Sequence, residues 1–109
     1  MNNRHEKEIV YISGAISSDP NYKEKFANAQ MVLEHLGYAA ISPTMIPPIL
    51  TEDEHMYIDL HLIDVSDTLV LLPDWTQSHG APIERDHAMR IGKRVVLYCG
   101  LETERPIKK

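Results

Sequence analysis

Apolar and polar residues are arranged along the chain in two different patterns. Three short runs, at 8–13, 68–73 and 94–98, are almost continuously apolar, with many β-branched or aromatic members. Such runs are typical of strands that are buried on both faces, as in a parallel sheet. A weaker run at 38–42 follows Gly37 and predicts a further strand.

Segments with a helical period separate these runs. Their apolar positions are Tyr22, Phe26, Ala29, Leu33 and Leu36 in the first, Met56, Leu60 and Ile63 in the second, and Ala81, Ala88 and Ile91 in the third. Intervals of three and four residues place apolar side chains on one face of a helix. Gly37 and Gly92 are suited to end the first and third helices, and the second is expected to end near Ser66.

The alternation of strands and helices predicts an α/β fold. Right-handed crossovers between parallel strands place helices on both faces of the sheet. We therefore expect a three-layer, Rossmann- or flavodoxin-like sandwich with a parallel sheet of four to five strands, in the order 2-1-3-4 with a possible fifth. Residues 1–109 are expected to form a single domain.

In such sheets, ligands bind beyond the carboxyl ends of the strands. This rule selects four segments here: 13–19, 42–54, 74–84 and the residues from Cys99 onward. The stretch 43–54 is the longest irregular piece and contains three prolines. It is either a lid over a ligand or a stiff connection.

Composition and charge narrow the classes of function. Hydrophobic residues make up 43% of the chain, charged residues 25%, and the net charge is −5 with no basic patch. These values disfavour a nucleic acid polymer as the partner. No apolar run reaches the ~18 residues of a membrane span, and the charged start of the chain does not resemble a signal segment. The single cysteine, Cys99, fits a reducing, cytoplasmic location.

The most informative segment lies between the third strand and the third helix. Gly80 allows close approach of the backbone, and Pro82 fits the first turn of a helix. Glu84 is then expected in the first turns, directed at the strand ends. The alternative is that Glu84 is an ordinary helix-start acid that pairs with Arg85 or Arg90.

The second predicted helix carries further acids. Asp59 and Asp67 are eight residues apart, about two turns of a helix. Asp67 is expected to organise the junction with the next strand. For Asp59, the spacing leaves two alternatives: its side chain faces a binding site, or it faces away from one. His55 and Asp59 have the spacing of a helix-borne metal pair, but no HExxH or cysteine–histidine pattern completes a ligand set. We therefore expect no metal and no cofactor.

Taken together, the motifs resemble a known group. The matching residues are Tyr11-Ile12-Ser13-Gly14, Asn21, Phe26, Ala29, Leu33, Gly37, Ser42-Pro43, Asp59, Leu62, Asp67, Leu72-Pro73-Asp74-Trp75, Ser78, Gly80-Ala81, Glu84, Ala88 and Gly92. This ordered set, over most of residues 9–98, resembles the domain-of-unknown-function family 4406. That family belongs with the nucleoside 2-deoxyribosyltransferase-like proteins.

The resemblance implies roles for individual residues. Glu84 matches the glutamate that attacks the anomeric carbon in the transferases and in the related deoxynucleoside 5′-monophosphate glycosidases. Asp59 matches a second active-site acid, which would orient the sugar or protonate the departing base. Tyr11 matches a tyrosine that lines the site at a strand end. Gly14 matches a turn that lets a ligand approach the backbone.

The position six residues before Glu84 discriminates between substrates. By resemblance, the nucleoside transferases have an aspartate there and the monophosphate glycosidases have a serine, as Ser78 is here. A serine hydroxyl and nearby N–H groups can donate to a 5′-phosphate, which a carboxylate would repel. Gly80 and Ser17 complete the expected binding residues together with Trp75, which either stacks on a base or covers the core or an oligomer contact.

The chain also departs from the pattern. Ala15 stands in place of a serine, and Ser17-Ser18-Asp19 replaces an expected basic residue, which leaves two phosphate contacts open. No asparagine near the C-terminus matches the one that a neighbouring subunit contributes in the transferases.

Three classes of function follow from these patterns. The first is an enzyme that hydrolyses or transfers an N-glycosidic bond of a nucleotide with Glu84 as the nucleophile. The second is a non-catalytic nucleotide-binding protein, a sensor or sequestering module of the same fold. The third, a purely structural domain, leaves the arrangement of Ser78 and Glu84 unexplained. The expected partner is a small nucleotide or nucleoside, and the exposed sheet edges predict a homo-oligomer.

Overall fold

Four parallel strands form one sheet in the order β2-β1-β3-β4. The strands are β1 (Ile9–Ser13), β2 (Ala39–Ile41), β3 (Thr68–Leu71) and β4 (Arg94–Leu97). The structure is a computed structural model and describes residues 6–101. The predicted order of the strands and their parallel direction are confirmed.

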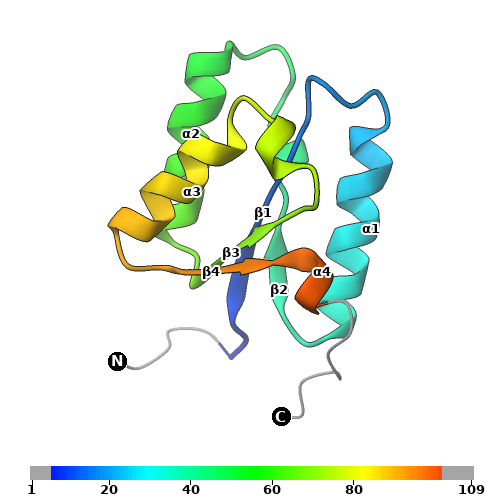
Figure 1. The fold of residues 1–109 in the computed structure, drawn as a ribbon, viewed down its shortest axis with the longest axis vertical. Helices are drawn as coiled ribbons and strands as arrows, with labels where there is room; N and C mark the ends of the chain where they lie inside the picture. Colours follow the sequence, from blue (N-terminus) through cyan, green and yellow to red (C-terminus); the bar gives the residue numbers. More distant parts are fainter. Residues whose placement is uncertain (1–5, 102–109) are drawn as a thin grey trace.

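Helices cover both faces of the sheet (Figure 1). The helices are α1 (Tyr22–His35), α2 (Glu52–Asp64), α3 (Ala81–Arg90) and the short α4 (Tyr98–Leu101), with 3-10 turns η1 (Pro43–Met45) and η2 (Trp75–Gln77). One core cluster joins the sheet to α1 and α4, and a second joins it to α2 and α3. The predicted three layers are therefore confirmed. None of these helices, all within residues 6–101, is long and apolar enough to cross a membrane.

The predicted helix ends agree with the structure because glycine terminates two of the helices. Gly37 follows α1 with φ of 103°, and Gly92 follows α3 with φ of 80°. Residues with a side chain rarely adopt these backbone angles, so glycine is suited to both positions.

The end of the fourth strand differs from the prediction. β4 stops at Leu97, and Tyr98 begins α4 with its side chain in the core cluster that α1 also contributes to. Leu97 itself is 53% exposed on the edge strand, so this strand is not buried on both faces as its apolar sequence suggested. The possible fifth strand is absent from residues 98–101, and the residues beyond lie outside the described part of the chain.

The irregular stretch before α2 is shorter than predicted, because the helix begins at Glu52. The hydroxyl of Thr51 accepts a hydrogen bond from the N–H of Glu54 (3.1 Å), and the Glu54 carboxylate accepts one from the N–H of Thr51 (2.9 Å). This reciprocal capping box satisfies two N–H groups at the start of the helix. Threonine followed three residues later by glutamate is the sequence sign of such a box.

Short polar contacts join the amino-terminal ends of β1 and β3. Asp67 accepts a hydrogen bond from the N–H of Ile9 at 2.8 Å, and its own N–H donates to the Ile9 carbonyl. Asp67 therefore organises the junction between α2 and β3, as predicted. Because all strands run in one direction, the loops 14–21, 42–51 and 72–80 gather at the opposite, carboxyl edge.

Candidate active site

A cavity of about 370 Å³ opens at the carboxyl ends of the strands. This size falls within the range of small-molecule sites. Three of the four segments expected there line it, through residues that include Gly14, Ser17, Pro43, Ile46, Ser78 and Glu84. No residue from Cys99 to Leu101 faces it. Since Pro43, Ile46 and other residues of the β2–α2 connection line the cavity, that connection forms one of its walls.

Glu84 lies at the bottom of this cavity, in the first turns of α3, and is only 5% exposed. Its Oε2 accepts a hydrogen bond from the Tyr11 hydroxyl at 2.9 Å, and its Oε1 accepts one from the Ser13 hydroxyl at 2.6 Å. Tyr11 and Ser13 are two residues apart on β1, so both project from the same face of the strand. The alternative pairing with Arg85 or Arg90 is not what the structure shows.

A second buried carboxyl group, Asp59, faces the same cavity from α2. Its Oδ1 is buried without a hydrogen-bond partner. Burial raises the pKa of Asp59, and burial together with the neighbouring charge of Asp59 raises the pKa of Glu84 to about 8. Two carboxyl groups this close share a proton near neutral pH and titrate as a pair.

The hydrogen bonds distinguish the two members of this pair. Both oxygens of Glu84 accept a hydrogen bond, which favours its ionised form and works against burial. Asp59 has an oxygen with no donor, but its charge and its hydrogen bond with Glu84 raise the pKa of Glu84, so the two groups hold the shared proton as a pair. The pair thus offers one carboxylate and one carboxylic acid in the same cavity.

Tyr11 lies beneath Glu84 rather than in the lining of the cavity. Its side chain is fully buried, and it faces the cluster formed with α2 and α3. Burial, and then the charges of Glu84 and Asp59, raise the pKa of the Tyr11 hydroxyl well above its usual value. The phenol therefore stays protonated and acts as a hydrogen-bond donor to the carboxylate. It positions Glu84, whereas the sequence-based prediction had it touching the ligand.

Ser78 and Gly80 form one wall at the start of α3. The Ser78 oxygen accepts hydrogen bonds from the N–H groups of Gly80 (3.2 Å) and Ala81 (3.0 Å). These two N–H groups are therefore engaged with Ser78, whose own hydroxyl hydrogen can still be donated towards the cavity. The expected backbone contribution of Gly80 to a phosphate is thus reduced, and the Ser78 hydroxyl is the donor left at this wall.

Gly14 and Ser17 line the cavity from the loop after β1. A Cβ atom on Gly14 would lie 2.8 Å from Leu72 Cδ1 and 3.2 Å from Asp74 Oδ1. The glycine is therefore required by the close packing of the ends of β1 and β3. This reason differs from the approach of a ligand to the backbone that the resemblance implied.

Trp75 does not line the cavity. Its ring is partly buried against the cluster of the sheet with α2 and α3, and the guanidinium of Arg85 lies 5.6 Å from the ring centroid. Of the two roles considered for Trp75, covering the core fits this placement and stacking on a base within the cavity does not.

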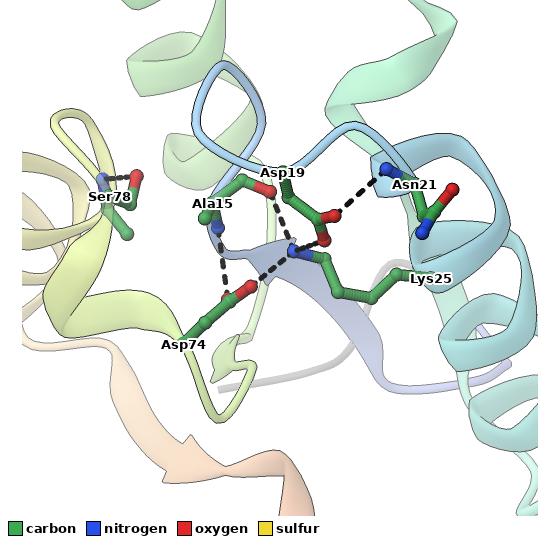
Figure 2. A network of polar contacts seen from close by, with 7 residues as sticks. Ala15, Asp19, Asn21, Lys25, Asp74 and Ser78 are labelled. Atoms are coloured by element: carbon green, nitrogen blue, oxygen red, sulfur yellow. Dashed lines mark hydrogen bonds and ion pairs between the residues drawn. The ribbon is translucent and has the colours of Figure 1, made fainter.

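A polar network next to the cavity joins the loops after β1 and β3 (Figure 2). The Lys25 ammonium donates to the Asp74 carboxylate and to the Ala15 carbonyl, and it pairs with Asp19 at 2.8 Å. The Ala15 N–H donates to Asp74 Oδ1 at 3.1 Å. Phosphate contacts were expected from position 15 and from the stretch 17–19, and two of these residues, Ala15 and Asp19, instead fasten the two loops together.

Several residues of the site were not predicted as site residues. Ser13 carries a signal in the sequence, because it lies two residues after Tyr11 in a strand. His55 was considered only as a metal ligand, and Lys23 was not considered; both line the cavity. Within residues 6–101, no three histidine, cysteine, aspartate or glutamate side chains are grouped as ligands of a metal ion.

Comparisons with known proteins place this chain in a family. The profile described as Domain of unknown function (DUF4406) matches residues 8–97, which include every residue of the site discussed above. The chain belongs to this family. The DUF4406 assignment that the motifs suggested is therefore confirmed, and a comparison with curated proteins returned no match.

The fold of this DUF4406 protein is shared with a solved enzyme structure. It is similar to the 2-desoxiribosyltransferase from Leishmania mexicana, with a TM-score of 0.67 and 19% sequence identity over 83% of this chain. The chain spans 63% of the length of that protein. Identity at this level shows a common fold, and the expected nucleoside 2-deoxyribosyltransferase-like architecture is thereby confirmed.

Proposed function

We propose that this DUF4406 protein cleaves or transfers the N-glycosidic bond of a nucleotide, with Glu84 as the nucleophile. One observation carries the proposal: a buried carboxylate, held by two hydroxyl groups, faces a cavity at the strand ends. A core residue gains nothing from such burial, because desolvation of a carboxyl group costs stability. The shared fold with a 2-desoxiribosyltransferase supports the same chemistry.

The reaction proceeds in two steps. The Glu84 carboxylate attacks C1′ of the sugar, the bond between C1′ and the base nitrogen breaks, and its electron pair leaves with the base. Water, or a second base in a transfer reaction, then attacks C1′ and releases Glu84. The Tyr11 and Ser13 hydroxyl groups hold the carboxylate in place, and the free oxygen of Asp59 faces the sugar.

Two features of the cavity wall support a phosphorylated sugar. The Ser78 hydroxyl keeps a hydrogen to donate, and Lys23 lines the cavity with no ion pair among residues 6–101. A lysine and a hydroxyl group suffice to favour a 5′-phosphate over a 5′-hydroxyl. This pair stands in for the phosphate contacts that Ala15 and the loop 17–19 do not provide.

Release of free base from a panel of substrates tests the proposal. Deoxy- and ribonucleotides, with the matching nucleosides, are incubated with the protein and the products separated by chromatography. We expect base release from at least one nucleotide, and a loss of about a thousand-fold or more in Glu84→Ala. Glu34→Ala, which removes an acid on the outer face of α1, is the matched control and retains full activity. Equal rates in both variants contradict the proposal.

A second function, nucleotide binding without turnover, is favoured by one observation. A pKa of about 8 leaves Glu84 largely protonated at neutral pH, and a protonated carboxyl group is a poor nucleophile. In that case the same nucleotides raise the melting temperature without releasing base, because a ligand of the folded state stabilises it by mass action. The base-release panel and a thermal shift assay on the same ligands separate the two functions.

A further inference from the structure

His55 lies one helical turn before Asp59 on α2, and both residues line the cavity. We propose that His55 is the acid that protonates the departing base, and that Asp59 is thereby left to hold the sugar. This inference rests on the proposed function and adds a catalytic residue that neither the motifs nor the resemblance assigned.

The position of His55 along α2 matches the order of groups in the substrate. Residues four apart lie on one face of a helix, separated by about 6 Å along its axis. Asp59 is the deeper of the two, beside Glu84, where the sugar carbon must be for attack. His55 is nearer the start of the helix and is less buried than Asp59, so it is within reach of a base attached to that sugar carbon and directed away from Glu84.

The surroundings of His55 are suited to a planar base. Ile46, Pro48 and Leu50 line the cavity from the connection before α2, and Met56 follows His55. Apolar walls with a few polar groups are typical of sites that hold a flat ring. His55 is the histidine in this part of the lining, and its two ring nitrogens can donate to a ring nitrogen or carbonyl of a base.

The other titratable groups of the cavity are less well placed for this step. Glu52 is exposed on the first turn of α2, and His79 is exposed beside Ser78, on the wall assigned to the phosphate. Tyr22 and Lys23 line the cavity from the first turn of α1, away from α2 and His55. Asp59 lies next to Glu84 and keeps an oxygen without a partner, which suits a sugar hydroxyl. His55 also acts on Asp59 electrostatically, opposing the effect of burial on the pKa of Asp59.

The step balances in protons and electrons. As a Glu84 oxygen forms its bond to C1′, the electron pair of the C1′–N bond moves onto the base, and the proton of the His55 imidazolium moves to the base. Neutral base and neutral imidazole result. In the second half, water attacks C1′, the bond to Glu84 breaks with its electrons, and the proton of water returns to His55.

A comparison of leaving groups tests the inference. The best nucleotide of the base-release panel is compared with the 4-nitrophenyl glycoside of the same sugar phosphate, whose leaving group departs without protonation. We expect His55→Gln to lower kcat about a hundred-fold or more on the nucleotide and less than about three-fold on the nitrophenyl substrate.

The matched control is His61→Gln, on the same helix but exposed and outside the cavity, which leaves both rates unchanged. Equal losses on both substrates with His55→Gln, or no loss on either, overturn the role of His55 while the proposed function stands. Wild-type protein that turns over neither substrate overturns both proposals. His55→Asn is assayed in parallel, and its folding and that of His55→Gln are checked by melting temperature.

Discussion

At the scale of single residues, the Tyr11 hydroxyl determines how readily Glu84 ionises. Tyr11→Phe removes a hydrogen bond of 2.9 Å to Oε2 and leaves the ring in the core. A hydrogen bond to a charged group contributes about 1.5–3 kcal/mol, so we expect a further rise in the pKa of Glu84 and a loss of about ten-fold or more in activity at pH 7. Titration of ¹³C-labelled glutamate carboxyl groups by NMR measures the pKa directly.

Tyr57→Phe is the control for this prediction, because Tyr57 is exposed on α2. It leaves the titration of Glu84 unchanged. If Tyr11→Phe also leaves it unchanged, the proposed positioning by the Tyr11 hydroxyl is wrong.

Some residues of the site could be predicted from the sequence, and others could not. The resemblance selected Glu84 and Asp59, and the structure brings both to one cavity. Ser13 went unrecognised although its spacing from Tyr11 was visible. The roles of Gly14 and Ser78 could not be read from the sequence, because they depend on Leu72 packing and on N–H groups that only the folded chain brings near.

At the scale of elements, the capping box stabilises the start of α2, the helix that carries the cavity residues His55 and Asp59. Thr51→Ala removes the acceptor for the Glu54 N–H, and the loss of such a cap costs about 1 kcal/mol of stability. Since His55 lies in the first turns of the same helix, we also expect weaker nucleotide binding. Urea unfolding and calorimetric titration measure the two effects.

The control is Thr76→Ala, at an exposed position in η2. Its unfolding midpoint stays near that of the wild type. A Thr51→Ala variant that unfolds at the wild-type midpoint contradicts the role given to the capping box.

The loops after β1 and β3 are also held in position by a few polar contacts. Lys25→Met removes the cation between Asp19 and Asp74 (Figure 2) and leaves two carboxylates facing each other across the gap. We expect KM for the nucleotide to rise several-fold, with a smaller change in kcat, because Ser17 and Ser78 on these loops lose their relative positions. Steady-state kinetics distinguishes the two constants.

Lys7→Met removes an exposed lysine just before β1, at the other end of that strand from this network, and serves as the control. Unchanged KM in Lys25→Met, or a fall in kcat alone, would show that the network does not set the shape of the cavity.

The hydrophobic periodicity and the glycines that end helices were sufficient to predict the helices and strands, but not all of their ends. The positions of Gly37 and Gly92 agree with the structure since glycine can adopt the required backbone angles. The end of β4 was predicted one residue too late, because an apolar run does not distinguish a strand residue from Tyr98, which turns into the core. The start of α2 lies among polar residues, where the hydrophobic period gives no signal.

At the scale of the whole molecule, the buried carboxyl pair makes stability depend on pH. Burial raises the pKa of Glu84 from 4.5 to about 8, so between these values the folded protein binds more protons than the unfolded chain. Stability therefore falls as the pH rises through this window and is greatest at its lower end. The raised pKa of Asp59 acts in the same direction.

Glu84→Gln removes this ionisation and keeps the shape of the side chain. We expect the variant to exceed the wild type in stability at pH 8, by on the order of 3 kcal/mol, and to match it near pH 5. Chemical denaturation at both pH values measures the difference, with Glu34→Gln as the exposed control. A variant that is less stable than the wild type at pH 8 would mean that the ionised Glu84 stabilises the fold.

The fold class and the strand order were available from the sequence because they depend on a regular alternation of patterns. The oligomeric state and the cytoplasmic location stay predictions. Exposed apolar side chains on the edge strand and on α3, such as Leu97 and Met89, fit the expectation of a homo-oligomer. Sedimentation velocity determines that state.

The central claim is that Glu84 forms a covalent bond to the sugar. A nucleotide with fluorine at C2 of the sugar slows both steps, and with a good leaving group it accumulates the intermediate. Mass spectrometry of the intact protein, and then of its peptides, is expected to show one added sugar phosphate, attached at Glu84 and absent from Glu84→Gln. Base release without any adduct, or an adduct on a peptide that lacks Glu84, would contradict the account.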